Sequence, residues 1–426
     1  MPSWLVAMVI AASPGLQTDR APAAVFGGQA VPECGWPNVV ALGGRCTGTL
    51  IHPRVVVYAA HCGGMETVNF VDNDLTGPKR EVPTRTCGVF PREEGELGRD
   101  FAYCVLEEAQ TDIPIVPPLM GCEVDQLVPG TEVRVVGFGL DEEGVAGVKR
   151  ELTTTFDRFE NEEAFITGGG DACVGDSGGP AFVRVVDDET GAESWRVFGI
   201  VSHGDLACED GTYYGLMHVG MDWFESSSQF DLTPCTDAAG TWQPDARCGK
   251  FPTELFDLDG AWPDGCGDAA RGGPVSTCGT ARSEEVDDLP PTIEFVTPEA
   301  DLQVATDPEG NLADVAIELV AEDASGIAEL RLRVDGEVIP GGARGLGPYT
   351  YEPSFPQGLY EVDAVAEDYA GNVAVSELRL VAVDTPLPES EDEGCACRTR
   401  TSPPGWWLAL LPLFTRRRRY SGAGSV

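Results

Sequence analysis

Short β-rich segments, each bounded by glycine or proline, dominate residues 25–230 and restrict the folds open to this part of the chain. RVVVYAA at 54–60 and TEVRVVGFG at 131–139 are typical of them. Their spacing favours an antiparallel sandwich or barrel over alternating βαβ units. One short closing helix is expected in VGMDWFESSSQF, at the end of the segment. At 426 residues, the whole chain is long enough for two or three domains.

Residues 231–288 differ from this β-rich part in composition. They combine glycine, proline, aspartate and tryptophan with four cysteines, Cys235, Cys248, Cys266 and Cys278, and contain few apolar runs. This composition predicts a small disulfide-stapled segment or an ordered linker. DLDG at 257–260 is a fragment of a calcium-loop pattern, but the full EF-hand spacing is missing. An acidic turn is therefore the preferred interpretation.

Residues 289–384 form a second unit with the alternating pattern of β-strands. Val315, Ile317 and Leu319 alternate with polar or smaller residues, and an Asp-Gly pair at 335–336 predicts a tight hairpin turn. About a hundred residues of short strands fit a β-sandwich. The D-x-A-G-N element at 368–372 resembles one found in immunoglobulin-like modules of bacterial surface proteins. Such modules often serve as spacers, and nothing in this one predicts catalysis.

The charge of the chain excludes one class of partner. It has 70 acidic and 28 basic residues and a formal net charge of −42, whereas nucleic-acid binding relies on Lys and Arg. Such a surface favours solubility and attraction to basic proteins or peptides. A general habit of acidic surfaces explains the charge equally well. Hydrophobic residues make up 42% of the chain, which is enough for genuine cores.

Both ends of the chain indicate export. Fourteen cysteines suggest an oxidising compartment, and the apolar run from Trp4 to Ala12 has the length of a signal-peptide core. Residues 1–24 are therefore expected to be a signal peptide with a short pro-segment.

The C-terminal part, residues 385–426, contains an acidic linker, Cys395 and Cys397, the run WWLALLPLF and a cluster of four arginines. The apolar run is about half the length needed to span a bilayer. This tail resembles the myxobacterial C-terminal sorting signal, which directs surface display. The resemblance implies that Cys395 or Cys397 is a processing or lipidation point, and that any membrane association occurs through the tail alone.

The segment TGGGDACVGDSGGP at 167–180 crowds glycines around Ser177. Glycine is used where the backbone takes unusual dihedrals or approaches another group closely. Ser177 is therefore a candidate nucleophile beside backbone N–H groups that face a developing oxyanion. A plain acidic surface turn is the alternative.

A base and an acid are available for such a serine. His61 lies beside Cys62, which could pair with Cys46 and hold the imidazole in place. Asp100 precedes the apolar run FAYCVL, which predicts a carboxylate at the edge of a strand. An aspartate behind a histidine fixes its tautomer while the histidine takes the serine proton.

His61 in AAHC, Asp100 in RDFAYCVL and Ser177 in GDSGGP follow the His-Asp-Ser order of the chymotrypsin–trypsin family. Residues 25–230 resemble that family, which implies two six-stranded antiparallel β-barrels. The resemblance also implies peptide hydrolysis through an acyl-enzyme without metal or cofactor. A catalytically silent protein of the cell surface that binds or adheres is the rival hypothesis. A carbohydrate-binding role of the second β-unit is a third.

The resemblance assigns further roles around the serine. Gly175 and Ser177 would supply the oxyanion-hole N–H groups, and Asp176 would pair with a new N-terminus at Val25. Ala24, rather than Arg or Lys, precedes Val25. An unidentified protease that prefers small residues, or trimming after a first cut, is therefore expected to activate the chain.

Asp171 lies six residues before Ser177, where trypsin-like members carry the aspartate at the base of the specificity pocket. The resemblance thus implies cleavage after Arg or Lys, with Ser202, Gly204 and Gly215 as further pocket residues. Gly215 fits its place only with a one-residue gap, and without the gap Tyr214 would fall there. A shallow pocket in which Asp171 merely caps the glycine turn is the alternative.

The resemblance also implies disulfide pairs. Cys46–Cys62 and Cys173–Cys208 follow from it, while Cys34–Cys122 and Cys87–Cys104 form one of three possible pairings of the remaining four cysteines.

Overall fold

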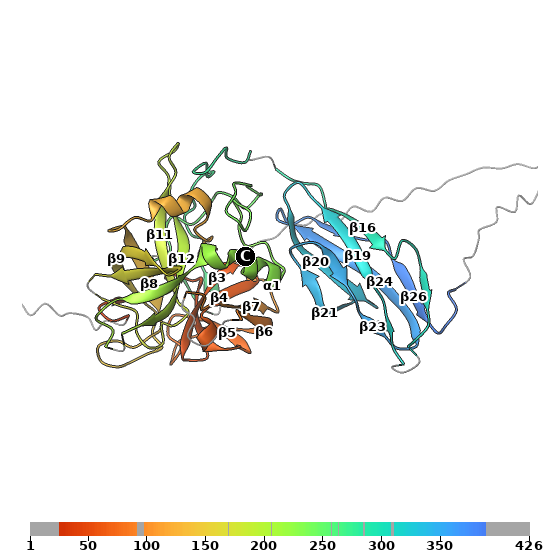
Figure 1. The fold of residues 1–426 in the computed structure, drawn as a ribbon, viewed down its shortest axis with the longest axis horizontal. Coiled ribbons are helices and arrows are strands. Elements are labelled where there is room, and N and C mark those ends of the chain that lie inside the picture. The colour runs from red at the N-terminus through yellow and green to blue at the C-terminus, as the bar shows by residue number, and fades with distance from the viewer. Residues whose placement is uncertain are drawn as a thin grey trace, which may run out of the picture. The chain divides into compact units, whose positions relative to one another are not determined.

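The computed structural model describes residues 25–91, 98–168, 170–205, 207–256, 258–262, 264–283, 286–307 and 311–388. Its first part is a closed antiparallel barrel, with the strand order β2-β3-β4-β7-β6-β5 (Figure 1). The strands are β2 (Val39–Leu42), β3 (Cys46–His52), β4 (Val55–Tyr58), β5 (Thr67–Val71), β6 (Lys79–Val89) and β7 (Ala102–Leu106).

A second antiparallel barrel follows. Its strands run in the order β9-β10-β13-β12-β11-β8, and pairing of β8 with β9 closes it, while the short β1 (Gln29–Ala30) adds to β9. The two six-stranded barrels confirm the expected fold class. The strands are β8 (Glu132–Gly137), β9 (Arg150–Glu160), β10 (Glu163–Thr167), β11 (Pro180–Val186), β12 (Glu193–Gly204) and β13 (Thr212–Leu216).

Alternate residues of the barrel strands enter different cores, which explains their continuous apolar runs. On β4, Val56 and Tyr58 pack inside the first barrel, whereas Val55 and Val57 belong to a cluster shared by the two barrels. Successive strand residues point to opposite faces of a sheet, so a strand covered on both sides needs apolar residues at every position. The shared cluster also contains Val136 from β8, and therefore joins the barrels where the candidate site lies.

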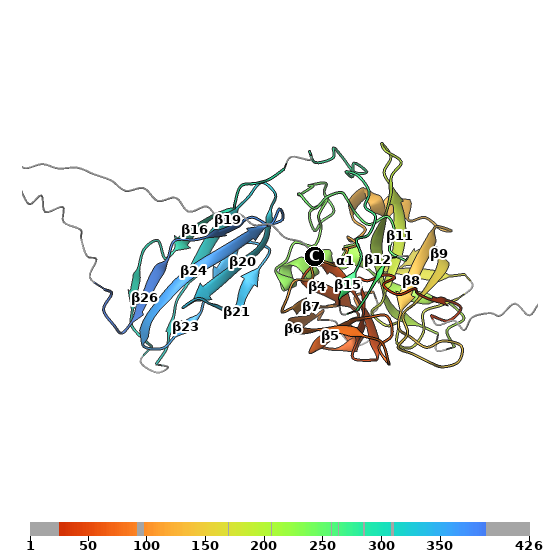
Figure 2. The same ribbon diagram turned by 180° about the vertical axis from the view of Figure 1, so that it is seen from behind.

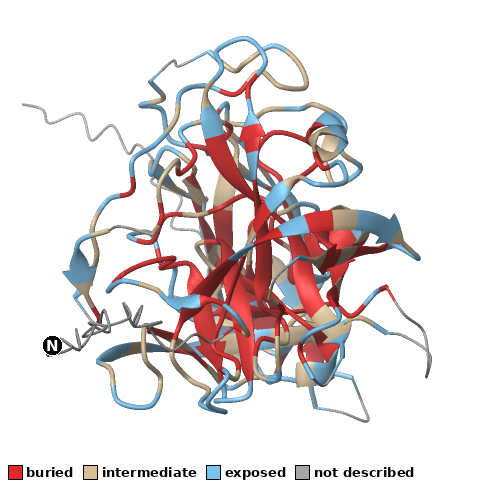
Figure 3. Cartoon of the chain, turned by 90° about the vertical axis from the view of Figure 1, so that its left-hand side faces the viewer, coloured by how far each residue is buried: buried red, intermediate tan, exposed pale blue. Residues whose placement is uncertain are grey.

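The expected closing helix is present as α1 (Met217–Ser228). It ends at Gln229, which takes the left-handed conformation that terminates many helices. Met217, Met221 and Phe224 pack into the cluster between the barrels. Figure 3 shows the buried residues concentrated along the strands, with exposed residues in the surrounding loops. No helix in the described ranges is long and apolar enough to cross a bilayer.

The cysteine-rich segment is bonded covalently to the barrels. Four pairs were expected among the protease-like cysteines, and of these Cys34–Cys122 is wrong because the partners of both residues come from residues 231–288. Where the structure describes it, that segment otherwise forms only the two-residue strands β14 (Gly260–Ala261) and β15 (Gly265–Cys266). The six disulfides among the described cysteines are Cys34–Cys266, Cys46–Cys62, Cys87–Cys104, Cys122–Cys278, Cys173–Cys208 and Cys235–Cys248. The other three expected pairs are thus confirmed.

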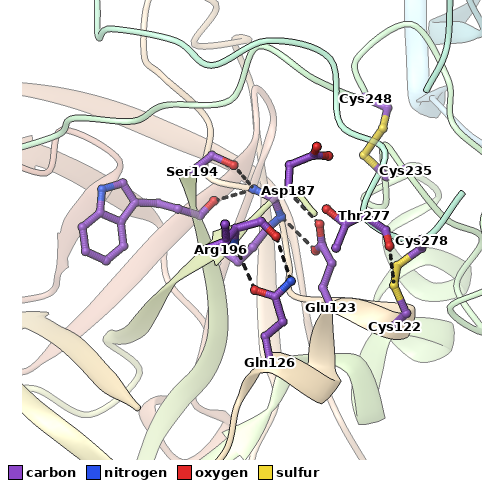
Figure 4. Close-up of polar contacts among 12 residues, drawn as sticks. Cys122, Glu123, Gln126, Asp187, Ser194, Arg196, Cys235, Cys248, Thr277 and Cys278 are labelled. Atoms are coloured by element: carbon purple, nitrogen blue, oxygen red, sulfur yellow. Dashed lines mark hydrogen bonds and ion pairs between the residues drawn. A yellow bond between two sulfur atoms is a disulfide. The ribbon is translucent and has the colours of Figure 1, made fainter. Parts of the chain in front are cut away.

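A buried ion pair supports the barrel at one of these attachment points. Arg196 on β12 donates two hydrogen bonds to Glu123, at 2.9 and 2.7 Å. Glu123 belongs to the 3₁₀ helix η2 (Gly121–Gln126), which also carries Cys122. Figure 4 shows the pair next to the Cys122–Cys278 disulfide. Nearby, Asp187 accepts a hydrogen bond of 2.6 Å from the backbone N–H of Ser276.

Residues 292–383 form two further sheets, seen best at the blue end of the ribbon in Figure 2. One sheet has the order β16-β19-β22, and the other has the order β17-β26-β24-β20-β21, with β25 paired to β24. β18 (Ala313–Asp314) pairs separately with β23 (Ser354–Phe355). The remaining strands are β16 (Thr292–Thr297), β17 (Leu302–Val304), β19 (Ile317–Glu322), β20 (Ile327–Val334), β21 (Glu337–Arg344), β22 (Tyr349–Tyr351), β24 (Gly358–Asp368), β25 (Val373–Val375) and β26 (Arg379–Val383).

One hydrophobic cluster joins the two sheets, as in a sandwich. Ile317 and Leu319 of the smaller sheet share it with Leu330 and Leu332 of the larger one. The expected hairpin turn connects β20 to β21, with both central residues, at 335 and 336, at positive φ. The immunoglobulin-like relationship stays a prediction. The expected signal segment 1–24, Cys395 and Cys397 lie outside the described residues.

Candidate active site

The candidate base and its orienting acid meet at the edge of the first barrel. His61 belongs to the 3₁₀ helix η1 (Ala60–Cys62), and the disulfide from Cys62 to Cys46 ties that helix to β3. The His61 Nδ1 atom lies 2.6 Å from Asp100 Oδ2, and the backbone N–H of His61 donates to Asp100 Oδ1 at 3.0 Å. Both carboxylate oxygens therefore fix the position of one histidine. Its Nε2 atom is left for proton transfer.

Asp100 is held as a carboxylate although its side chain is only 3% exposed. Burial alone would raise the pKa of Asp100, but the hydrogen bond and charge of His61, with a further hydrogen bond from Ser202, bring that pKa below its ordinary value. The Ser202 hydroxyl donates to Asp100 Oδ2 at 2.9 Å. Ser202 was expected only at the specificity pocket, so its side chain adds a role that sequence reasoning missed.

Ser177 lies in a turn that a residue of the first barrel holds in place. The carbonyl oxygen of Ser177 accepts a hydrogen bond of 2.9 Å from the backbone N–H of Thr47. The Thr47 hydroxyl donates to the Gly175 carbonyl at 3.0 Å and accepts from the Phe138 N–H at 3.1 Å. Gly178 has φ +84°, and a Cβ atom there would lie 2.4 Å from the Thr47 carbonyl oxygen. The glycine is therefore required for this close approach of the two barrels.

The two expected oxyanion donors remain available. Among the described residues, no internal acceptor is found for the backbone N–H of Gly175 or of Ser177. Gly175 has φ +103°, and a Cβ atom there would lie 2.8 Å from the Cα atom of Gly139. In the same part of the chain, no hydrogen bond joins the Ser177 hydroxyl to His61. Catalytic hydrogen bonds are often long before substrate binds.

Asp176 is fully buried beside the serine. Its two carboxylate oxygens accept from the Gly139 N–H at 2.7 Å and from the Cys173 N–H at 2.9 Å. Cβ atoms at Gly137 and Gly139 would lie only 2.0 and 2.4 Å from its oxygens. Burial raises the pKa of Asp176 to about 7, although both backbone hydrogen bonds lower it. The glycines of the 137–139 segment thus make room for a carboxylate that carries an electrostatic penalty.

Val25 is fully buried among the residues that fill the second barrel. The adjacent Phe26 forms a β-bridge with Asp171, whose N–H donates to the Phe26 carbonyl at 2.9 Å. The N-terminal end of the described chain therefore runs along the base of the expected specificity pocket.

Asp171 at that base is 3% exposed and accepts three hydrogen bonds from the protein. The backbone N–H groups of Ala172 and Gly211 donate to it at 2.8 and 2.9 Å, and the Thr212 hydroxyl donates to its Oδ1 atom. Burial raises the pKa of Asp171, although these donors lower it. Thr212 was not among the expected pocket residues, because nothing in the sequence set the register of β13.

The assignment of Gly215 to the pocket is wrong. A Cβ atom on Gly215 would lie 2.8 Å from the Phe101 ring, which belongs to the cluster between the barrels. Tyr214 points to the other face of the strand and packs inside the second barrel, 1% exposed. The register of β13 therefore presents the Thr212 hydroxyl to Asp171. Tyr214 lies on the same face of the strand as Thr212, and burial together with the charge of Asp171 raises the pKa of Tyr214.

His203 follows Ser202 where family members carry tryptophan. Its ring stacks on Tyr213, with 4.8 Å between the centroids and 9° between the planes. The Nδ1 atom lies 3.4 Å from the buried carboxylate of Glu163. His203 is thus a partly exposed strand residue with a carboxylate and an aromatic ring beside it.

Comparisons with known proteins agree with this geometry. Residues 25–219 match the trypsin family model. This segment is therefore similar to trypsin-like serine proteases. A trypsin-like protease from Streptomyces glaucescens is 28% identical over 233 residues, which cover 48% of this chain and 82% of that protein. Human serine protease 56 is 29% identical over 259 residues, which cover 53% of this chain and 42% of that protein.

Solved structures of human heparin binding protein are also similar to this chain. One has a TM-score of 0.41 and 18% identity, and covers 47% of this chain and 95% of its own. An atomic-resolution structure of the same name gives the same values.

Proposed function

We propose that the chain is a secreted serine endopeptidase in which Ser177, His61 and Asp100 form the catalytic triad. The observation that carries the proposal is the pair of hydrogen bonds that fix His61 on Asp100, at 2.6 and 3.0 Å. The N–H groups of Gly175 and Ser177, which have no acceptor within the described ranges, lie in the turn held by Thr47 and support the proposal further.

The reaction follows the template of serine proteases. The Ser177 oxygen attacks the peptide carbonyl carbon while His61 Nε2 takes the hydroxyl proton. The N–H groups of Gly175 and Ser177 stabilise the resulting oxyanion. His61 then gives its proton to the leaving amine, which leaves an acyl group on the serine. Water, activated by the same histidine, hydrolyses that ester and restores the enzyme.

Asp171 supports selection of a basic side chain before the cleaved bond. A buried carboxylate favours a cation as its partner. The neighbouring loop adds the exposed acidic residues Asp205, Glu209 and Asp210, and the charge of Asp205 raises the pKa of Asp171 further. Together with the net charge of −42, this arrangement favours basic peptides as substrates, with an attraction that salt weakens.

Activation by cleavage before Val25 completes the proposal. A free α-amino group at Val25 would place a cation near Asp176, whose pKa burial raises to about 7. Such an ion pair removes the penalty of the buried carboxylate and fixes the turn that carries Gly175. Export through the N-terminal segment and surface display through the Cys395–Cys397 tail are parts of the same proposal.

The test compares protein that starts at Val25 with its Ser177→Ala variant on an unbiased peptide library, with cuts mapped by mass spectrometry. Ser226→Ala is the matched control, since this serine is exposed on α1. Cuts made by the first protein and the control, but not by Ser177→Ala, are expected. Equal cutting by the Ser177→Ala protein would refute the mechanism, and no cutting by any of them would favour the silent binding protein.

A further inference from the structure

The base of the specificity pocket differs from an open carboxylate because Thr212 is bonded to it. Thr212 is 2% exposed, and its hydroxyl donates to Oδ1 of Asp171. The same oxygen also accepts the backbone N–H of Ala172 at 2.8 Å. Within the described residues, Oδ2 accepts from the Gly211 N–H alone, at 2.9 Å. One carboxylate oxygen is therefore saturated by the protein, and the other has capacity for one more donor.

The Thr212 hydroxyl also lies beside Gly204, one of the expected pocket residues. A Cβ atom on Gly204 would lie 2.9 Å from Thr212 Oγ1. A side chain at position 204 would therefore meet the hydroxyl that is already bonded to Asp171. A ligand that reaches Asp171 beside Gly204 meets the threonine oxygen together with the carboxylate.

These contacts affect the two basic side chains differently. An arginine guanidinium binds a carboxylate best through two parallel N–H bonds, one to each oxygen. Oδ1 of Asp171 cannot accept one of these two N–H bonds, because Thr212 and Ala172 already donate to that oxygen. A lysine ammonium is a compact charge with three donors and needs no such fork. It can donate to Oδ2 of Asp171 and to the lone pair of the Thr212 hydroxyl at once.

We infer that Thr212 is a specificity-determining residue that makes the pocket select lysine over arginine before the cleaved bond. This inference rests on the proposed peptidase function and narrows its substrate class. The hydroxyl accepts a hydrogen bond from the substrate cation while it donates one to Asp171. It thereby occupies one of the two acceptor positions that a bidentate bond to arginine requires.

Matched peptide substrates that differ only in Lys or Arg at this position test the inference. For protein that starts at Val25, kcat/KM is expected to be about tenfold higher for Lys, the size of one hydrogen-bond difference in a pocket. Thr212→Ala frees Oδ1 and should move the Lys/Arg ratio about tenfold toward Arg, whereas Thr212→Ser keeps the hydroxyl and the ratio. An Arg preference in the parent protein, or an unchanged ratio in Thr212→Ala that folds normally by circular dichroism, would overturn the inference.

A binding measurement separates this inference from the proposed function. Butylamine and butylguanidine are titrated by NMR into the Ser177→Ala protein, and the amine is expected to bind more tightly. Tighter amine binding without any hydrolysis by the parent protein would refute the peptidase and keep the pocket assignment. Hydrolysis together with tighter guanidine binding would refute the assignment of Thr212 and keep the peptidase.

Discussion

Thr47 is the residue by which the first barrel holds the candidate nucleophile turn, and its replacement by valine tests that link. The side chain is fully buried, and its hydroxyl serves two backbone groups of the second barrel. It donates to the Gly175 carbonyl at 3.0 Å and accepts from the Phe138 N–H at 3.1 Å. Valine keeps the shape of threonine and removes both hydrogen bonds.

The size of the effect follows from the two partners left behind. A buried donor or acceptor without a partner costs roughly 1–3 kcal/mol, so the loss in the free energy of unfolding should be about 2–4 kcal/mol. Thr47→Ser keeps the hydroxyl and loses one methyl group, which costs about 1 kcal/mol. The difference between the two variants therefore isolates the hydrogen bonds.

The assay is urea unfolding in the Ser177→Ala background, so that self-digestion cannot disturb the measurement. In the active background, Thr47→Val should also lower kcat by about 10- to 100-fold, because Gly175 carries a proposed oxyanion donor and small displacements there are costly. A Thr47→Val protein as stable as Thr47→Ser would refute the structural link. Unchanged kcat with the expected loss of stability would refute only its effect on the oxyanion hole.

Three other predictions concern a buried acid, the triad and the disulfides. Burial raises the pKa of Glu225 from its ordinary 4.5 to about 7. The folded chain therefore keeps a proton that the unfolded chain loses, and this stabilising term is lost as the pH rises from about 4.5 to 7. In Glu225→Gln, the amide oxygen can still accept hydrogen bonds from Leu232 and Thr233. Thermal or urea unfolding should show this variant as stable as the parent at pH 4 and more stable by about 1–3 kcal/mol at pH 8. Equal stability of the two proteins at both pH values would contradict the burial argument. Ser202→Ala removes a hydrogen-bond donor to Asp100. This variant should lower kcat about 5- to 10-fold and raise the apparent pKa on the acid side of the pH–rate profile. A change in KM alone would count against the positioning role of Ser202. Peptide mapping without reduction should recover Cys34 linked to Cys266 and Cys122 linked to Cys278, and recovery of Cys34 linked to Cys122 would contradict the fold of residues 231–288.

The barrels and the closing helix could be predicted from the sequence because each depends on local patterns. Apolar runs such as the one on β4 mark strands that are buried on both faces. The motifs around His61 and Ser177 are short stretches of adjacent residues and can be identified without knowledge of distant contacts. The hairpin turn at 335–336 was predictable for the same reason, since an Asp-Gly pair takes the two positive φ values that the turn needs.

The rest depends on contacts between residues far apart in the chain. Cys34 and Cys266 are separated by 232 positions, and no local pattern shows that the cysteine-rich segment returns to the barrel. Thr47 and Gly175 meet across the two barrels for a similar reason. The register of β13 decides whether Thr212 or Gly215 faces Asp171, and a shift of one residue turns every side chain to the opposite face. A strand composed of small and aromatic residues leaves that choice open in the sequence.

Mass spectrometry of a trapped acyl-enzyme tests the triad most directly. Protein that starts at Val25 is mixed with a slowly hydrolysed lysine ester, quenched in acid and digested, and the acylated peptide is sequenced. The account predicts a single acyl group on Ser177 and its absence in Ser177→Ala. An acyl group on another residue, or none in a protein that still cleaves peptides, would contradict the proposed mechanism.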